Sequence, residues 1–450
     1  MGRLFWEILD RTMTGPIMKE DEFENEFFPD KIAEIVAEHK IEWDPDEPIM
    51  SDPSMADEIF KAGIELLVEV GLYCKDTKRI VKFTEEEIKE VIRTRKSEVT
   101  LGKDRDAITL KPRAPGDEQH PYTFFPAGIP TRHLNVYKQY ALTTAQEPTC
   151  DGLFALPLVG IEEVKPAAGT PTAMLLTLTE AQIMNEVAAR VGRPGLFLGI
   201  PTSATTPMTS IAAFSSGLYN KYNCCMPVQI LQDMRINYDR LNLAYFAQLH
   251  GIVPWISSCP ILYAYLTGPA QAAVEIIAHT LGTMAFSDSS FTQGMACTID
   301  SRYTGNDIWW CTSAAALAAE RNLKVPWISF GSAGERPGPL SDESFYGTAA
   351  ACITACISGM EGMWLVGGAT GLQARWGGEI TRAAAGLKVS DGIAIIKEIT
   401  KKLKESEPTR TPFDELYDPK TLRPSKKFLD HYKKFTKIFK DMGLDYPSWD

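Results

Sequence analysis

The sequence lacks an excess of positive charge. Its 450 residues include 46 Lys and Arg against 58 Asp and Glu, which gives a formal net charge of −12 at pH 7. Nucleic-acid phosphates would repel such a chain, because binding to them depends on cationic side chains. DNA and RNA binding are therefore disfavoured. Hydrophobic residues make up 44% and charged residues 23%, which excludes a disordered, collagen-like or coiled-coil chain.

A membrane-spanning run and a targeting segment are also missing. The 24 residues between His250 and Glu275 carry no charge, but Pro254, Pro260 and Pro269 divide them into a strand, a turn and a helix. The start of the chain has no signal-peptide layout, and Trp6 stands where a myristoylation motif needs Ser or Thr. We expect a cytoplasmic protein with no membrane partner.

Familiar metal and nucleophile motifs are absent. The nine cysteines show no CxxC spacing, which favours reduced, mostly buried thiols. The six histidines show neither HxxH nor HExxH spacing, and adjacent Cys224 and Cys225 would point to opposite faces of a strand. A GxSxG elbow is missing too. The sequence therefore predicts no protein-bound metal and no Ser-His-Asp catalysis.

The middle of the chain is poor in charge and alternates two kinds of apolar segment. Between residues 121 and 324 only 24 of 204 residues are charged, about half the fraction of the whole chain, so this part is predicted to be mostly interior. Short β-branched runs predict strands at 123–127, 152–158, 195–200, 226–231, 254–259, 289–297, 325–330 and 361–366. Longer runs between them predict helices at 173–190, 209–218, 239–250, 270–284, 306–322 and 343–358.

Alternating strands and helices indicate a parallel sheet, because parallel neighbours need crossover connections. Eight strands in this length favour a closed (β/α)8 TIM barrel over residues 121–386, with an N-terminal helical cap at 1–120 and a C-terminal helical extension at 387–450. In the cap, Thr84 and Glu87 have the spacing of a capping box. A doubly wound open sheet is the alternative fold, although no GxGxxG turn follows the first strand.

In a barrel the site lies where strands end. Asp233 is the one carboxylate that ends an apolar strand in the charge-poor region, so desolvation would affect it; a structural ion pair with Arg235 is the alternative. Glu335 also lies in a loop after a predicted strand, and we expect its carboxylate to be more exposed than that of Asp233. The other strand ends carry small or neutral groups, whose glycines would let a large planar ligand approach the backbone. These groups include Gln232, Gln293, Gly331, Ser332, Gly367 and Gly368, and the charged Arg336 lies at the same strand end as Gly331.

Tryptophans also gather near the strand ends of the second half. Most tryptophans are buried in protein cores wherever they occur, and that is one interpretation. The other is that Trp255, Trp327 and Trp364 form a cage for a quaternary or protonated amine, because a ring face attracts a cation.

Four segments carry a family resemblance. AGIELLVEVGLYCKDTKRIVKFTEEEI (62–88), LGKDRDAITLKPRAPGD (101–117), GRPG (192–195) and TGLQARWGGEITRAAAGLKVSD (370–391) closely resemble the monomethylamine methyltransferases of methanogenic archaea, in order and nearly end to end. The resemblance implies a (β/α)8 barrel that moves a methyl group from a methylated amine to the Co(I) of a corrinoid (cobalamin) carried by a partner protein. That corrinoid protein would dock over the barrel mouth. We also expect a homo-oligomer.

The chain departs from this family at one position. The family carries pyrrolysine in the loop after the GRPG strand, where its imine ring is thought to add the amine; counting from GRPG places Met208 there. Methionine has no electrophilic carbon, so this adduct cannot form. The family's nearby acid falls at about Asp233. Pyrrolysine-free members of the related trimethylamine branch act on quaternary amines such as glycine betaine, which suggests an already activated methyl donor here.

The resulting hypothesis assigns roles to particular residues. Met208 and Asp233 would be the catalytic positions. Trp255, Trp327, Trp364, Gln232, Gln293, Ser332 and Glu335 would bind substrate, and Gly331, Arg336, Gly367 and Gly368 would face the corrinoid. Three alternatives stay open: a non-catalytic binder of the corrinoid protein, a barrel enzyme acting on another methyl donor such as a methoxylated compound, and a lyase or aldolase. The strand ends offer neither the Schiff-base lysine nor the carboxylate cluster that the last would need.

Overall fold

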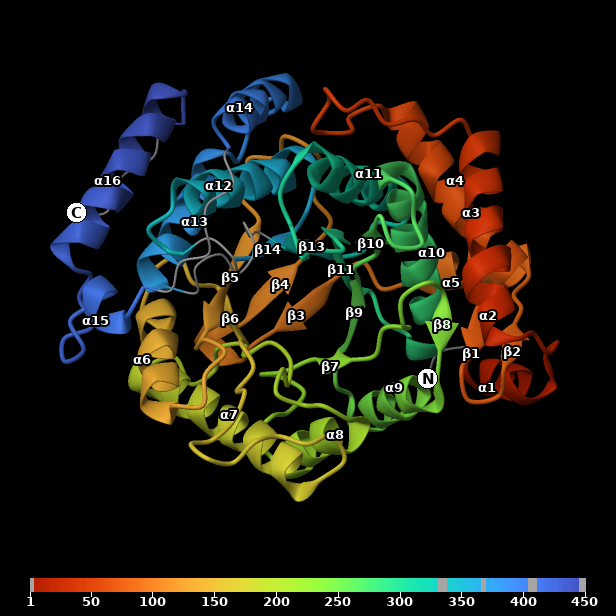
Figure 1. The fold of residues 1–450 in the computed structure, drawn as a ribbon, viewed down its shortest axis with the longest axis horizontal. Helices are drawn as coiled ribbons and strands as arrows, with labels where there is room; N and C mark the ends of the chain where they lie inside the picture. The colour runs from red at the N-terminus through yellow and green to blue at the C-terminus, as the bar shows by residue number, and fades with distance from the viewer. Residues whose placement is uncertain (1–3, 331–337, 366–369, 404–410, 445–450) are drawn as a thin grey trace.

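The computed structural model describes residues 4–330, 338–365, 370–403 and 411–444, which form a barrel surrounded by helices (Figure 1). Seven parallel strands make one sheet in the order β6-β5-β14-β13-β11-β9-β7. They are β5 (Tyr122–Ala127), β6 (Gly152–Ala155), β7 (Met226–Pro227), β9 (Pro254–Ser258), β11 (Phe291–Gly294), β13 (Trp327–Phe330) and β14 (Gly362–Trp364). β14 pairs with both β13 and β5, so the last strand lies beside the first.

The segment 195–200 completes the barrel between β6 and β7. Leu153 N–H donates to Phe197 O at 2.7 Å on one side, and Leu198 N–H donates to Asn223 O at 2.7 Å on the other. Regular pairing is interrupted at Gly199, which has φ +84°; a Cβ there would lie 2.9 Å from the backbone of β6. The predicted closed, parallel (β/α)8 barrel is therefore confirmed.

Helices follow the strands and cover the barrel, as the alternation predicts. They are α6 (Leu134–Ala145), α7 (Pro171–Arg190), α8 (Pro207–Ser215), α9 (Tyr238–His250), α10 (Pro269–Ser287), α11 (Asn306–Asn322), α12 (Asp342–Ile357) and α13 (Gly371–Ala383). β7 is shorter than the predicted run 226–231, because the chain leaves the sheet there and Ile230 N–H donates to Thr283 Oγ1 of α10.

The N-terminal region contains strands as well as the predicted helices. Its helices are α1 (Phe5–Thr14), α2 (Glu20–Glu22), the π-helix η1 (Phe23–Phe27), α3 (Phe28–Glu38), α4 (Pro53–Val70), α5 (Glu85–Thr94) and the short η2 (Asp104–Asp106). The predicted capping box of Thr84 and Glu87 opens α5. β1 (Leu72–Cys74) pairs with β2 (Arg79–Val81) and with β8 (Arg235–Ile236), which ties this region to the loop after β7.

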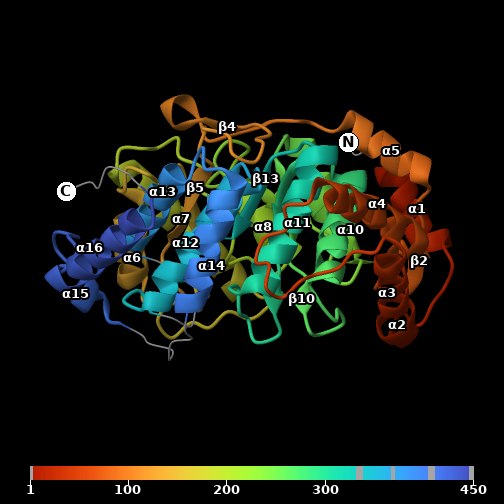
Figure 2. The same cartoon turned by 90° about the horizontal axis from the view of Figure 1, so that it is seen from above.

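A hairpin of β3 (Val99–Leu101) and β4 (Ile108–Leu110) closes the N-terminal end of the barrel. Leu101 and Leu110 pack into a buried cluster with Phe124, Phe154 and Phe197. Figure 2 places this hairpin and the β10 loop (β10, Ile261–Leu262) at opposite ends of the barrel. The hairpin thus covers the N-terminal end of the barrel interior.

The C-terminal helices α14 (Val389–Lys402), α15 (Phe413–Leu416) and α16 (Lys426–Asp441) lie outside α12 and α13 (Figure 1). Phe428, Tyr432, Phe435 and Phe439 repeat along α16 and are buried. In the described part of the chain, no helix has the length and apolar character needed to cross a bilayer.

Candidate active site

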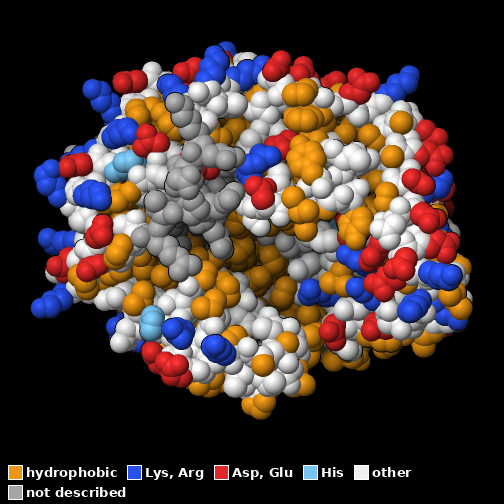
Figure 3. All heavy atoms as spheres, in the orientation of Figure 1, with side chains coloured by type: hydrophobic (Ala, Val, Ile, Leu, Met, Phe, Trp, Pro, Cys, Tyr) orange, Lys and Arg blue, Asp and Glu red, His pale blue; other side chains and the backbone are white. Residues whose placement is uncertain are grey.

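The C-terminal face of the barrel is hollowed at its centre, and hydrophobic side chains line the hollow (Figure 3). Side chains alternate along each strand, so Trp255 and Ser257 of β9 share one face, and Phe291 and Gln293 of β11 the same one. Trp255 and Phe291 belong to the cluster that fills the barrel. Gln293 and Ser257 therefore lie above it, nearer the mouth.

Aromatic rings form the floor of the mouth. Trp364 stacks on Phe154 with ring centroids 4.6 Å apart, and Phe330 contacts Trp364 edge-on at 5.3 Å. Trp255 lies 5.9 Å from Phe154. The structure thus brings two of the three predicted tryptophans, Trp255 and Trp364, into the barrel interior.

Trp327 does not reach this interior. It precedes Ile328, which is in the inner cluster, so strand alternation turns Trp327 toward the helices. Its ring occupies the space beside Gly294, where a Cβ would fall 2.1 Å from the indole. All three tryptophans are near strand ends in the sequence, but Trp327 differs from the other two in the face of the strand that it occupies.

The buried polar atoms of the mouth include several donors. Ser257 Oγ donates to Gln293 Oε1 at 3.3 Å, which fixes the orientation of the amide. Gln293 Nε2 and the indole N–H groups of Trp255 and Trp364 are buried, and none has a hydrogen-bond partner among the described residues. Buried polar atoms normally have partners. These three are candidates to bind an acceptor group on a ligand.

Gln232 and Asp233 lie in the loop after β7, where Asp233 and Met234 adopt a left-handed backbone. Gln232 Nε2 donates to Cys259 O at 2.6 Å. Asp233 has φ +57°. Its Oδ2 accepts from Arg235 at 2.8 Å, and Arg235 also pairs with Glu24. Asp233 therefore forms the ion pair with Arg235 that the alternative interpretation predicts. Burial raises the pKa of Asp233, and the positive charge of Arg235 opposes this shift.

A buried glutamate from α10 holds the same stretch. Glu275 Oε1 accepts from Asp233 N–H at 3.0 Å, while Glu275 Oε2 is buried without a partner among the described residues. Burial, together with the nearby Asp233 carboxylate, raises the pKa of Glu275 to about 8. Sequence reasoning missed Glu275, whose one signal is that an acid interrupts a long uncharged run.

Met208 is the second residue of α8 and is 61% exposed. The loop before it is anchored by Glu180 of α7, whose carboxylate accepts from Ser203 N at 2.6 Å, Thr202 Oγ1 at 2.8 Å and Tyr219 OH at 2.9 Å. Burial raises the pKa of Glu180, and these donors oppose the shift. Sequence reasoning missed Glu180 as well, because nothing in a helical pattern reveals a partner loop.

Apolar side chains rim the mouth on loops that follow the strands. Each exposes between 37% and 71% of its surface. They are Val159 and Val164 after β6, Met208 on α8, Ile261, Tyr263 and Tyr265 after β9, and Ile299 after β11. An apolar patch of this kind is typical of a protein-binding surface.

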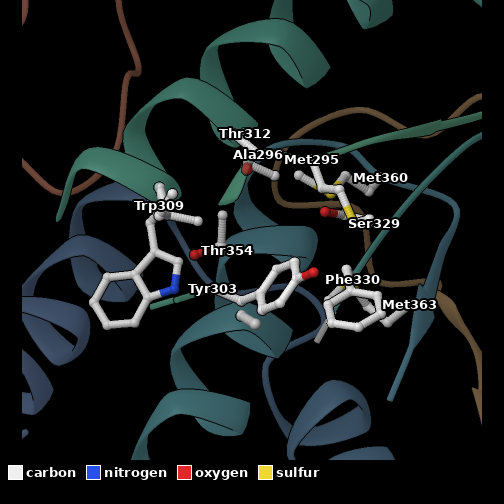
Figure 4. A pocket seen from close by; sticks show the side chains of 12 residues that line it. Met295, Ala296, Tyr303, Trp309, Thr312, Ser329, Phe330, Thr354, Met360 and Met363 are labelled. Carbon is white, nitrogen blue, oxygen red and sulfur yellow. The ribbon is translucent and has the colours of Figure 1, made fainter. Parts of the chain in front are cut away.

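A separate small cavity lies beside Tyr303, Phe330 and Trp309 (Figure 4). Its volume is about 10 Å³, which is room for roughly one water molecule. It is therefore too small for a substrate. Within the described ranges, no group of three or more His, Cys, Asp or Glu residues is placed to hold a metal.

Several predicted site residues lie outside the described residues. They are Gly331, Ser332, Glu335, Arg336, Gly367 and Gly368.

These features define a TIM-barrel protein with one closed end and an aromatic-floored mouth at the other, where enzymes of this fold carry their active sites. The model of the family described as monomethylamine methyltransferase MtmB matches residues 4–444, and the chain belongs to that family. This confirms the resemblance drawn from the four sequence segments.

Known relatives cover nearly the whole chain. Monomethylamine methyltransferase MtmB of Methanosarcina mazei is 26% identical, and MtmB2 of Methanosarcina barkeri is 25% identical; each alignment covers 98% of both chains. The crystal structure of the Methanosarcina barkeri monomethylamine methyltransferase superposes with a TM-score of 0.90 at 24% identity over 98% of both chains. A crystal structure of the hydroxylamine MtmB complex gives 0.89. The structural matches establish the fold.

Proposed function

We propose that this protein transfers a methyl group from a small methylated, quaternary-amine-like donor to the Co(I) of a corrinoid carried by a partner protein, without pyrrolysine. One observation carries the proposal: a member of this family places an aromatic floor of Trp255 and Trp364 in its barrel mouth and a methionine at the expected pyrrolysine position.

The donor class follows from the leaving group. Methyl transfer to Co(I) is a displacement at carbon, in which the methyl–nitrogen bond breaks and the nitrogen keeps the electron pair. A quaternary ammonium releases a neutral amine, whereas a neutral amine would have to release an amide anion. Because Met208 cannot form a covalent adduct, the donor must already be activated. The barrel then needs mainly to orient it and exclude water.

The floor of the mouth suits such a donor. A cation over a tryptophan face gains about 0.5–2 kcal/mol, more as water is excluded. Asp233 would add an opposite charge: Arg235 binds its Oδ2, so Oδ1 would be the oxygen that stabilises the cation. We also propose that Gln232 contributes to this wall, where its amide is held by Cys259 O.

The unpartnered donors favour a substrate with a second, acceptor end. Gln293 Nε2 and the two indole N–H groups would bind a carboxylate or ether oxygen, which a simple tetraalkylammonium ion lacks. A betaine-like zwitterion satisfies both requirements. A methoxylated compound supplies the acceptor without the cation and is the second candidate.

The apolar rim supports a partner that covers the mouth. A corrinoid is broad and flat, and the protein that carries it would bring it over the opening bounded by Val159, Tyr263 and Ile299. The corrinoid, when present, supplies the nucleophilic cobalt. This chain's residues position the donor beneath it, and the rim excludes water.

Association between copies of the chain is part of the proposal. Trp6 and Met13 of α1 and Leu249 of α9 are each more than half exposed, and Trp6 packs on Tyr245 of α9 at 5.7 Å. Light scattering on the wild type and on Trp6→Glu tests this: a smaller mass for the variant supports a homo-oligomer interface here.

A donor panel tests the function. The purified protein is mixed with a reduced corrinoid partner and monomethylamine, trimethylamine, tetramethylammonium, glycine betaine or a methoxylated aromatic, and the absorbance change of corrinoid methylation is followed. We expect methylation from the betaine and not from monomethylamine. Rapid methylation from monomethylamine would show that another residue activates the amine. Tight partner binding with no methylation from any donor would favour the non-catalytic binder.

A further inference from the structure

Two cysteine thiols meet at the rim of the mouth. Cys259 directly follows β9, and Cys297 begins β12 (Cys297–Thr298), three residues after β11. Their sulfurs are 3.7 Å apart, and the Cys259 thiol is hydrogen-bonded to Cys297 Sγ. We propose that Cys259 and Cys297 form a reversible disulfide that closes when the protein meets a two-electron oxidant such as hydrogen peroxide.

The backbone holds the pair in place. β9 and β11 are parallel neighbours, and the ladder continues beyond them: Met295 N–H donates to Ser258 O at 3.0 Å, and Cys297 N–H donates to Pro260 O at 3.2 Å. Each cysteine is therefore fixed next to a backbone hydrogen bond. The register pairs Cys297 with Ile261, so the two cysteines are diagonal neighbours. A disulfide needs the sulfurs to approach to about 2.0 Å, which side-chain rotation together with a shift at this end of the ladder would supply.

The other cysteines are placed differently. All nine lie within the described residues and are free thiols. Cys259 is the most exposed and Cys297 is 8% exposed, whereas the other seven are at most 2% exposed. Four buried thiols, those of Cys150, Cys224, Cys311 and Cys356, are hydrogen-bonded to backbone carbonyls. An oxidant as small as hydrogen peroxide thus meets the Cys259–Cys297 pair first.

The contact also changes the pKa values of the two thiols. The hydrogen bond from Cys259 lowers the pKa of Cys297, against the effect of burial, and Tyr303 acts in the same direction. The same hydrogen bond raises the pKa of Cys259. The hydrogen bond therefore favours loss of the proton from Cys297, and the thiolate is the reactive form of cysteine.

The reaction balances with one peroxide. The Cys297 thiolate attacks one peroxide oxygen, the O–O bond breaks, and the hydroxide that leaves takes up a proton to become water. The resulting sulfenic acid is then attacked by Cys259 sulfur, which loses its proton as the second water departs. Two thiols and hydrogen peroxide give one disulfide and two waters. Reduction by a dithiol reverses the change.

A disulfide here would act on the mouth. Cys259 O holds the Gln232 amide, and Tyr303, next to Cys297, packs on Phe330 with ring centroids 4.8 Å apart (Figure 4). Drawing Cys297 toward Cys259 removes its contact with Tyr303 and shifts this wall. Any effect on methyl transfer rests on the proposed function; the disulfide itself does not.

Peptide mapping tests the proposal on the full chain. Reduced protein is treated with hydrogen peroxide, alkylated, and digested with chymotrypsin, because no Lys or Arg lies between Cys259 and Cys297 while Tyr265 and Phe291 do. We expect loss of two free thiols and a cross-linked peptide joining Cys259 to Cys297, both reversed by dithiothreitol. Cys352→Ala, which changes a buried helical thiol, should keep the cross-link; Cys259→Ser and Cys297→Ser should each abolish it.

Two outcomes would overturn the proposal. One is wild-type protein in which Cys297 proceeds to sulfinic acid with no cross-linked peptide. The other is loss of thiols shared among the buried cysteines, which would mean that unfolding, and not the paired site, exposes them. Neither outcome depends on methyl transfer, so a failed donor panel leaves this test intact.

Discussion

Side chains on the inner face of the barrel strands have a different role from those on the outer face. Trp327 and Trp364 lie on neighbouring strands, yet Trp327 fills the space between the sheet and the helices, whereas Trp364 stacks in the barrel interior. The indole N–H groups of both tryptophans are buried without a partner among the described residues. Trp364 alone of the two belongs to the cluster inside the barrel, so its indole is the one that a ligand in the mouth could contact.

The same division holds for the acids that border the mouth. Glu180 and Glu275 come from helices outside the sheet and hold the backbone of two mouth segments. Asp233 lies on one of these segments, where its carboxylate pairs with Arg235. The helical shell thus fixes the geometry of the mouth, and few groups on the inner face are left to contact a ligand. The following changes separate the two roles.

The largest effect is expected at Glu180, the most fully bonded of the outer acids. Glu180→Ala should lower the free energy of unfolding by about 3–5 kcal/mol, since each buried donor left without an acceptor costs about 1–3 kcal/mol. Urea unfolding measures this. Glu186→Ala on the same helix is the control: its carboxylate pairs with Lys138 and Arg190 at the surface, and its loss should cost under about 1 kcal/mol. Equal midpoints for the two variants would remove Glu180 as the anchor of this loop.

At Asp233 we expect an effect on the reaction. Asp233→Asn should slow methyl transfer about 10–1,000-fold if its charge stabilises the cationic donor, in line with single electrostatic groups worth up to about 4 kcal/mol. Turnover with a quaternary donor is compared with turnover with a methoxylated one, because a charge effect needs the cation. Equal slowing with both donors would assign Asp233 to the ion pair with Arg235 alone.

The barrel was predictable because its signal is repeated. Eight strand-and-helix units, each with its own apolar pattern, agree on one fold, so the loss of regular pairing at Gly199 does not change the result. The site was predictable in part. Trp255 and Trp364 lie in the barrel interior, as a role in the mouth requires, but Trp327 faces the helices, because spacing alone does not tell which face a strand residue occupies. Glu180 and Glu275 could not be found, since their partners are distant in sequence. The Cys259–Cys297 contact joins residues 38 apart and has no motif.

Because of Glu275, we expect the stability of the fold to depend on pH. Its pKa is about 8 in the folded protein and near 4.5 when unfolded, so the folded state binds an additional proton between these values. Stability should therefore fall as pH rises through this window, by up to about 1.4 kcal/mol per pH unit. Glu275→Gln should flatten that part of the profile. Urea midpoints from pH 5 to 9 for wild type, Glu275→Gln and the surface variant Glu186→Gln measure it; parallel profiles for all three would mean that Glu275 is already ionised at neutral pH.

The smallest expected effect compares the two tryptophans directly. Trp364→Leu should raise the KM for a quaternary donor about threefold to tenfold, because a cation–π contact is worth about 0.5–2 kcal/mol, and should affect a methoxylated donor less. Trp327→Leu should leave the KM of folded protein near its wild-type value and instead lower stability, since it empties the space beside Gly294. Both variants remove one indole from adjacent strands, so they differ mainly in the face that they alter. If Trp327→Leu raises KM as much as Trp364→Leu, the inner face is not where the donor binds. If neither does, the aromatic floor is only core, and the acceptor end of the substrate becomes the main determinant of binding.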